Sequence, residues 1–378
     1  MAIRFRKPAT FLSGAVLFLF LPAVCAAAER ARLLYTYDEI ETSLVINDFK
    51  FLTPQHGVAI GFVFDRKSKV KPKTLITDDG GLHWKLNPAK DVGVCVFFLN
   101  ESQGWMATPK DIWETKDGGN NWKKISGIDD VQRLFFLDAQ RGWAAADKKK
   151  VYETADGGKT WTPLAAAEKP ASNPDLTTYN WIDFGTPKMG IIAGWNHPPE
   201  KSLSGLPEWM NPDRPRFERE KPRVTIFLQT RNGGQTWDST TGSLFGHVAR
   251  VRLSPAGFGL GLIEFTDAFE WPSEVFRIDW TTGKSERVFR EKNRLITDLA
   301  LPPTGPAYLA GIEKLDRLSD SPIPGKLKIY KSDNLAGWSE MDVDYRATAH
   351  RAMLSALDDR NIWVATDTGM ILKLPESR

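Results

Sequence analysis

One short phrase occurs four times along the chain and constrains the fold more than any other feature. Each copy has threonine, aspartate or asparagine, glycine and tryptophan at fixed intervals, and the copies occupy residues 77–84, 115–122, 154–161 and 230–237. A degenerate fifth copy occupies residues 333–338. Repeats a few tens of residues apart are typical of folds that array similar units side by side or around an axis. We therefore expect a repeat architecture.

The repeated phrase has the composition of a structural turn. Glycine supplies backbone angles that other residues avoid, aspartate accepts hydrogen bonds from turn amides, and tryptophan buries a large apolar surface. The repeated acidic position brings at most one acid per turn, so we expect neither a metal ion nor a catalytic carboxylate there. The residues with this predicted structural role are Asp79, Gly81, Trp84, Asp117, Gly119, Trp122, Asp156, Gly158, Trp161, Asn232, Gly234, Trp237, Asp333 and Trp338.

The segments between the phrases predict strands. Alternating apolar runs, such as residues 46–52, 94–99 and 131–137, are each followed by a small turn and a second apolar run. Runs of this length, rich in aromatic and β-branched residues and bounded by Gly, Pro, Asn and Asp, indicate hairpins. Four strands per unit and seven units predict an all-β fold, a seven-bladed β-propeller with four-stranded antiparallel blades.

The two ends of the chain are predicted to meet in the last blade. The seventh unit ends after its third strand, whereas an apolar run at residues 32–37 precedes the first unit. We expect this N-terminal strand to complete blade seven, which removes two exposed sheet edges. Residues 29–378 would then form a single propeller domain.

Residues 1–28 have the features of a secretory signal peptide. Three basic residues precede an apolar run over residues 11–24, and alanines occupy positions 26–28. This pattern predicts export and cleavage, and the run is too short to span a bilayer as a helix. We expect a periplasmic or secreted protein without a transmembrane segment in the mature chain. The alternative is a lipoprotein anchored at Cys25.

Charge and composition exclude several function classes. The formal net charge is +3, and removal of the three basic residues of the signal region leaves equal numbers of acidic and basic side chains. A balanced domain lacks the basic field that binds nucleic acid, so we expect no nucleic-acid partner. Cys95 is the one cysteine left after cleavage, and the five histidines do not occur at ligand spacing. We therefore expect a buried thiol, no metal and no cofactor.

The repeated phrases resemble the BNR or Asp-box repeat, which occurs in secreted sialidase-like propellers and in the photosystem II assembly and stability factor family. In those families the boxes are structural and lie away from the binding face. The resemblance implies a propeller that binds its ligand on the opposite face. Through the assembly factors it also implies an arginine-rich face and a protein or peptide partner, which could be part of a membrane complex.

The face opposite the boxes is expected to carry long loops. The connections between second and third strands are long at residues 65–73, 195–223, 264–273 and 313–326. Long loops on a rigid scaffold are the usual place of recognition. The insertion at 195–223 in blade four combines aromatic residues, arginines and prolines, which suits a contact surface; a lid packed on the neighbouring blade is the alternative. The aromatic binding candidates are Trp195, His197, Trp209 and Trp271.

A second set of binding candidates consists of arginines at or just before predicted innermost strands. These are Arg133, Arg250, Arg252, Arg294, Arg346 and Arg351. We expect several of them to line the mouth of the central channel, where guanidinium groups bind carboxylates through forked hydrogen bonds. The alternative is scattered surface charge, balanced by Asp298, Asp342 and Asp344.

These features predict a monomeric, non-enzymatic scaffold or assembly factor that binds a protein or peptide through its long-loop face. The alternative is a sialidase-like glycoside hydrolase, which needs an arginine triad, a tyrosine nucleophile and carboxylates. The Phe-Arg-Ile-Pro signature of such enzymes is absent, and their rings usually have six blades, so we favour the scaffold. The candidates for the enzymatic alternative are Tyr179, Tyr345, Glu264, Asp267 and Glu270.

Overall fold

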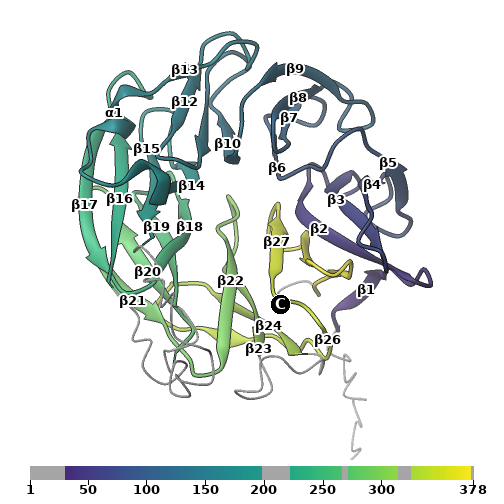
Figure 1. Ribbon diagram of the computed structural model, residues 1–378. Helices are drawn as coiled ribbons and strands as arrows, with labels where there is room; N and C mark the ends of the chain where they lie inside the picture. Colours follow the sequence, from purple (N-terminus) through teal and green to yellow (C-terminus); the bar gives the residue numbers. More distant parts are fainter. Residues whose placement is uncertain (1–29, 198–221, 266–270, 314–324, 376–378) are drawn as a thin grey trace, which may run out of the picture.

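The computed structural model describes residues 30–197, 222–265, 271–313 and 325–375, and within them it confirms the predicted propeller. Seven antiparallel sheets surround a central axis (Figure 1). The helical segments of these residues are short: α1 (Ala165–Glu168) and a 3-10 turn (Pro174–Leu176), which lie between blades three and four.

Each blade is a sequential antiparallel sheet whose first strand lies nearest the axis. Blade one comprises β2 (Thr42–Phe51), β3 (Gly57–Asp65), β4 (Val70–Thr77) and β5 (Lys85–Pro88). Blade two comprises β6 (Cys95–Phe98), β7 (Gly104–Ala107), β8 (Asp111–Thr115) and β9 (Lys123–Gly127). Blade three comprises β10 (Val131–Phe136), β11 (Gly142–Ala146), β12 (Val151–Thr154) and β13 (Thr162–Pro163). Blades four and five comprise β14 (Thr177–Phe184), β15 (Gly190–Asn196), β16 (Arg223–Thr230) and β17 (Asp238–Leu244); and β18 (His247–Leu253), β19 (Phe258–Glu264), β20 (Ser273–Asp279) and β21 (Lys284–Phe289). Blade six comprises β22 (Arg294–Ala300), β23 (Ala307–Glu313), β24 (Gly325–Ser332) and β25 (Ser339–Glu340), and the short β26 (Arg346–Ala347) also pairs with β24. Blade seven comprises β27 (Ala352–Ala356), β28 (Ile362–Thr366), β29 (Ile371–Lys373) and β1 (Arg32–Tyr35).

Blade seven is completed by the N-terminal strand, as the sequence predicted. β1 pairs antiparallel with β29, with Arg32 opposite Lys373 and Leu33 opposite Leu372. In Figure 1 the purple β1 lies beside the yellow C-terminal segment. The neighbouring side chains of Leu34 and Tyr35 pack against the core shared by blades seven and one. The ring is therefore closed by backbone hydrogen bonds between the two ends of the chain.

The Asp-box turns are stabilised by their own threonines. The Thr77 hydroxyl donates to Asp79 Oδ1 at 2.9 Å and accepts from the Gly81 amide at 2.9 Å. Gly81 has a φ of 96°, which favours glycine. The box with asparagine has the equivalent hydrogen bond, in which the Thr230 hydroxyl donates to Asn232 Oδ1 at 3.0 Å. A neutral amide oxygen is thus sufficient to hold the turn.

The degenerate fifth copy differs from the expected arrangement. Ser332 takes the place of threonine and accepts from the Leu335 amide. The side-chain acceptor of this turn is Asn334, which receives the amides of Ala336 and Gly337. Asn334 therefore has the role that the sequence suggested for Asp333.

Each full box also ties the outer hairpin of its blade to the inner hairpin. The first glycine of the pair donates its amide to a carbonyl in the turn between the first and second strands. The four bonds, of 2.8 to 2.9 Å, run from Gly80 to Gln55, from Gly118 to Ser102, from Gly157 to Gln140 and from Gly233 to Lys188. The boxes consequently lie at the end of the blade where the first strand finishes.

Large aromatic side chains join neighbouring blades at this same end. Trp363 of β28 is stacked on Phe51 of blade one, with ring centroids 3.6 Å apart, and donates its indole N–H to Gly80 O at 3.1 Å. Trp105 of β7 is stacked on Phe136 of blade three and donates to Gly157 O at 2.9 Å. A second-strand tryptophan therefore reaches the box of the following blade at both joints.

The innermost strands are irregular where they approach the axis. Five of those described contain a β-bulge, at Asn47, Gln132, Asn180, Ala249 and Thr297. A bulge leaves one residue unpaired and redirects the side chains that follow it. The bulge recurs at the same point of these strands, so it places equivalent residues of different blades at one level of the channel.

One predicted long loop is much shorter in the structure. β3 continues to Asp65 and β4 begins at Val70, so most of the segment 65–73 belongs to the sheet. The composition of this segment, which is rich in lysine, favours a loop. Charged side chains also suit the solvent-facing end of a β-hairpin, which is where the structure places them. The insertion of blade four leaves the sheet after Asn196 and re-enters it at Arg223. Residues 198–221 within it lie outside the described residues.

Candidate functional site

A polar cavity of about 290 Å³ occupies the channel of the propeller. All seven innermost strands contribute to its lining. In each strand, one lining residue pairs with the fourth position of the second-strand run, as Asp48 pairs with Ile60 in the run from Gly57 to Ile60. We call these seven residues the channel ring: Asp48, Cys95, Arg133, Trp181, Arg250, Asp298 and Met353. Lys50, Arg252 and Arg351 also line the cavity.

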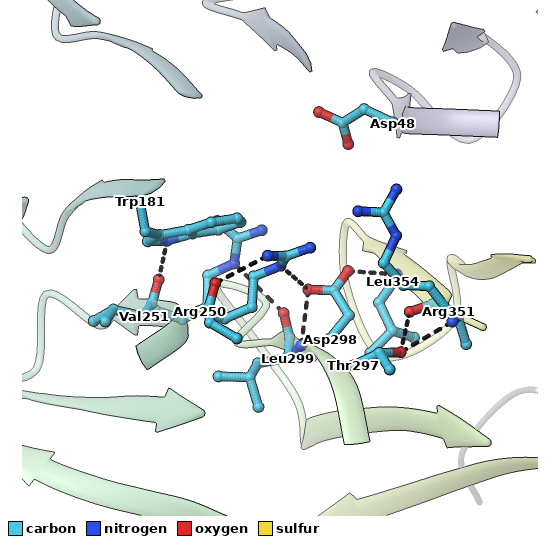
Figure 2. Close-up of polar contacts among 12 residues, drawn as sticks. Asp48, Trp181, Arg250, Val251, Thr297, Asp298, Leu299, Arg351 and Leu354 are labelled. Atoms are coloured by element: carbon cyan, nitrogen blue, oxygen red, sulfur yellow. Dashed lines mark hydrogen bonds and ion pairs between the residues drawn. The ribbon is translucent and has the colours of Figure 1, made fainter. Parts of the chain in front are cut away.

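Three aspartates of the innermost strands each connect their own blade to the following one. Figure 2 shows the Asp298 carboxylate between the Arg250 guanidinium and the backbone of blade seven. It accepts the Leu299 amide at 2.9 Å and the Leu354 amide at 2.8 Å. Asp48 likewise accepts the Val96 amide at 3.1 Å. These carboxylates therefore have a structural role as well as a charge.

The third aspartate, Asp183, lies two residues after Trp181 on the same strand. It accepts the Leu253 amide of blade five at 2.6 Å. Burial raises the pKa of Asp183, and the nearby Arg252 opposes this shift. The acid is thus held in the channel wall by a backbone bond and by a neighbouring guanidinium, 3.9 Å away.

Trp181 is the centre of an arginine cluster. Its ring is 3% exposed, and its indole N–H donates to Val251 O at 2.5 Å. The guanidinium carbons of Arg133, Arg250 and Arg252 lie 4.3, 4.5 and 4.8 Å from the centroid of this ring. Guanidinium groups are attracted to the faces of tryptophan, so Trp181 helps to hold three like charges in one small volume.

The arginines of the channel are compensated to different degrees. Arg133 donates to Asp48 Oδ2 at 2.9 Å. Burial lowers the pKa of Arg133, but Asp48 and other acids outweigh burial, so the pKa is raised. The Arg250 guanidinium is 3.6 Å from the Asp298 carboxylate, and burial lowers the pKa of Arg250. Arg351 donates to the backbone carbonyl of Asn47 at 2.7 Å. Arg250 and Arg351 therefore keep guanidinium N–H groups for a ligand.

Lys50 is a cavity residue that the sequence interpretation missed. It lies on β2, two positions after Asp48, and is partly buried. Burial lowers the pKa of Lys50 to about 8, and Arg252 and Arg133 act in the same direction. Asp48, Trp181 and Asp298 were also missed as members of a site. Their common position, three residues before the large apolar residue that ends or follows a first strand, was a signal that an alignment of the blades could have used.

Four of the six predicted arginines meet in the channel, and two do not. Arg294 begins β22, where it contacts Glu313 at 2.6 Å and Tyr330 at 3.1 Å. Arg346 belongs to β26, which pairs with the third strand of blade six, opposite Lys326. The cluster is consequently narrower than the sequence suggested and consists of Arg133, Arg250, Arg252 and Arg351.

The aromatic candidates lie away from the cavity lining. Trp195, at the end of β15, contacts His197 and His247 with centroid distances of 3.6 and 4.7 Å, and the Arg223 guanidinium lies over it. Burial lowers the pKa of His197, and Arg223 adds to this effect. Trp271 is covered by Arg290 at 3.4 Å. Trp209 lies outside the described residues.

The candidates for glycoside hydrolysis do not assemble in the cavity. Tyr179 is fully buried between blades and donates to Ala167 O at 2.9 Å. Tyr345 packs against the apolar core of blades six and seven. Burial raises the pKa of Glu264, which is close to Arg250 and Arg351. Asp267 and Glu270 lie outside the described residues. Within the described lining, the cavity contains no tyrosine.

The described residues form no cluster of His, Cys, Asp and Glu suited to a metal ion. Cys95 is 2% exposed, and burial raises the pKa of its thiol to about 12. In the same part of the chain, no helix is long and apolar enough to cross a bilayer.

No protein-family model matches the sequence, and a comparison with characterised proteins gives no match. Solved structures do resemble it. YCF48 bound to D1 peptide superposes with a TM-score of 0.56 at 16% identity, covering 94% of this chain and 100% of that one. YCF48 from Cyanidioschyzon merolae gives 0.57 at 14% identity, covering 92% and 99%. What they share with this chain is the fold.

Two further similarities show how widely this fold is used. The extracellular domain of BT4673 from B. thetaiotaomicron has a TM-score of 0.59 at 12% identity, over 91% of this chain and 40% of that one. The GH74 xyloglucanase from Xanthomonas campestris has a TM-score of 0.50 at 9% identity, over 88% and 59%. Binding proteins and enzymes thus share this architecture, so the function depends on the residues of the site.

Proposed function

We propose that the protein is an exported, non-catalytic propeller that binds an acidic segment of a partner polypeptide at its channel. The observation that carries the proposal is the lining of one cavity by Lys50 and four arginines, against two lining aspartates. Guanidinium groups recognise carboxylates by paired, charge-assisted hydrogen bonds. A ligand with Asp or Glu side chains, or a terminal carboxylate, is the chemical complement of this lining.

The position of the cavity in the channel is compatible with a polypeptide ligand. The innermost strands run towards the Asp-box turns, and the lining residues range from Arg351, just before β27, to Lys50 and Arg252, near the ends of β2 and β18. The cavity therefore extends along the innermost strands, which the inter-blade connections enter at the end opposite the boxes. A peptide could contact those connections while its acidic side chains enter the cavity.

The comparison with known structures is consistent with this proposal. A propeller that covers nearly the same length, YCF48, has been solved with D1 peptide bound. At 16% identity this likeness says nothing about the ligand of this chain. It does show that a propeller of similar length can hold a peptide.

The test compares two peptide pools of equal length, one rich in Asp and Glu and the other with Asn and Gln at the same positions. We expect the acidic pool to bind, and the double variant Arg250→Gln/Arg351→Gln to bind at least about tenfold more weakly, because charge-assisted hydrogen bonds contribute about 1.5–3 kcal/mol each. The matched control is Arg277→Gln/Arg287→Gln, which removes two more exposed arginines from β20 and β21. Equal binding of both pools, or no loss in the channel variant, would refute the proposal.

A further inference from the structure

Lys50 differs from every other cation of the channel cavity in its partners. Arg133 and Arg250 face carboxylates, Arg252 faces Asp183, and Arg351 donates to a backbone carbonyl. Within the described part of the chain, the Lys50 ammonium has no hydrogen bond or ion pair, although it lines the same cavity. A partly buried ammonium without an acceptor is costly, so an anion that reached it would be stabilised.

The charges around Lys50 leave room for such an anion. Five basic side chains line the cavity and two aspartates oppose them. Asp183 lies behind Arg252, and Glu264 lies close to Arg250 and Arg351. Even when both of these acids are ionised, the wall retains a positive excess. Each of the four arginines has an acceptor in the protein, so Lys50 is the cation of the described lining that is left uncompensated.

We propose that Lys50 forms the floor of a binding site for a small oxyanion, and that anion binding brings a proton onto the Lys50 amine. The ligand class is a sulfate-like or carboxylate anion that fits a cavity of about 290 Å³. Its oxygens would accept from Lys50 and from the free N–H groups of Arg250 and Arg351. This site would operate without a peptide partner, although an acidic side chain of a bound peptide presents the same chemistry.

The proton follows from the electrostatics of the empty cavity. Burial, Arg252 and Arg133 lower the pKa of Lys50 to about 8, while Asp48 and Asp298 oppose them. Near pH 8 part of the molecules therefore carries a neutral amine. A bound anion favours the charged form and returns the pKa of Lys50 towards that of an ordinary lysine. Binding near pH 8 is then accompanied by uptake of a fraction of a proton per anion.

Titration calorimetry with sodium sulfate and, separately, sodium succinate at pH 8 tests this inference. Neither anion titrates near pH 8, so heats measured in two buffers of different ionisation enthalpy give the proton uptake of the protein. We expect measurable proton uptake, a fraction of a proton per anion, with at least one of the anions. The two arms separate a tetrahedral oxyanion from a carboxylate as the preferred ligand.

Variants assign the proton to its residue. Lys50→Met should bind the anion about tenfold more weakly and without uptake, since one charged donor is lost. Lys50→Arg should bind without uptake, because arginine stays protonated. The exposed Lys85→Met on β5 should leave the uptake at pH 8 unchanged. Absence of binding, binding without uptake, or uptake that persists in Lys50→Met would each overturn the proposal. Peptide binding without proton uptake would overturn it while leaving the proposed function intact.

Discussion

The two ends of the blades show a clear contrast between repetition and irregularity. At the Asp-box end, the same threonine, glycine and tryptophan contacts recur from blade to blade, and Trp105 and Trp363 join neighbouring blades in the same way. In the channel ring, the seven equivalent positions carry five different residue types. Repetition stabilises the ring because the same contacts recur at more than one joint. A site needs groups that differ, so the irregular positions are where function is expected.

The N-terminal strand is the most sensitive part of the repeating framework. Deletion of residues 29–38 removes β1 from blade seven and exposes the edge of β29. It also removes Leu34 and Tyr35 from the core of blades seven and one. We expect this deletion to have the largest effect, a fall in melting temperature on the order of 10 °C or a loss of soluble protein, because several kcal/mol of burial are lost.

This prediction is checked by differential scanning calorimetry of the deleted and undeleted chains. Substitution of the exposed residue Ile40 by Ala, next to the deleted segment, serves as the control and should not change the melting temperature. If the deleted chain melts at the same temperature, β1 does not contribute to ring closure, and the framework is held by its inter-blade joints alone.

A single joint should show the next largest effect. Trp363 is fully buried, is stacked on Phe51 and donates to Gly80 O. Trp363→Ala leaves a cavity between blades seven and one and should lower the free energy of unfolding by about 3–5 kcal/mol. Trp363→Phe keeps the ring contact and loses the hydrogen bond, so its cost should be nearer 1 kcal/mol.

Chemical denaturation with urea measures both variants of Trp363. Leu82→Ala, in the box of blade one, is a suitable control because Leu82 is 48% exposed. A loss of less than about 1 kcal/mol for Trp363→Ala would mean that the joint relaxes around the missing indole, since rigid cores lose several kcal/mol for such a change.

The channel ring should be less important for stability, apart from its two aspartates. Asp298 accepts the amides of Leu299 and Leu354 and faces Arg250. Asp298→Asn keeps the shape but replaces one carboxylate oxygen by an NH2 group, so it loses one of the two backbone bonds as well as the charge that faces Arg250, and it should cost about 1–3 kcal/mol. Ser355→Ala is the neutral counterpart, since Ser355 accepts the Phe51 amide at the next joint. It should cost about 1 kcal/mol.

Unfolding of the two variants in parallel measures the difference. The comparison also reports on ligand binding, because Asp298→Asn increases the positive excess of the cavity. We expect tighter binding of acidic peptides together with lower stability. Equal stability of the two variants would show that the charge of Asp298 adds nothing measurable to the loss of one backbone hydrogen bond and is not needed to hold Arg250.

The repeating part of the molecule could be predicted from the sequence, and most of the site could not. Repeated boxes and alternating runs defined seven blades and the closing strand, because each is a local pattern with a single structural meaning. The arginine cluster depended on register. Arg294 was assigned to it because it begins the same strand as Asp298, yet it lies four positions before the level of the channel ring. Bulges such as that at Thr297 set this level, and they leave no local signal.

Lys50 was missed for a related reason. A lysine in an alternating strand is typical of a solvent-facing position, and only closure of the ring turns that face towards the axis. Trp181 was missed because tryptophan is common in this chain and usually packs between sheets. In the structure it lies under three guanidinium groups. Function in a repeat fold thus depends on positions where equivalent residues differ, and these positions are recognised only when the blades are aligned with one another.

The smallest expected effect concerns the acids of the boxes. Hydrogen bonds from His83 lower the pKa of Asp79 to about 2, and those from Thr160 lower that of Asp156 to about 2. Because the folded values lie below the unfolded value near 4, these acids contribute stability that is present above pH 4 and is lost as the pH falls to 2. The copy with Asn232 holds the same turn without a charge. Asp79→Asn/Asp156→Asn should therefore fold normally at pH 7 and lose less stability than the unsubstituted protein between pH 4 and pH 2. Melting temperatures across this range measure the difference. Parallel profiles for the two proteins would show that the boxes do not contribute to acid unfolding.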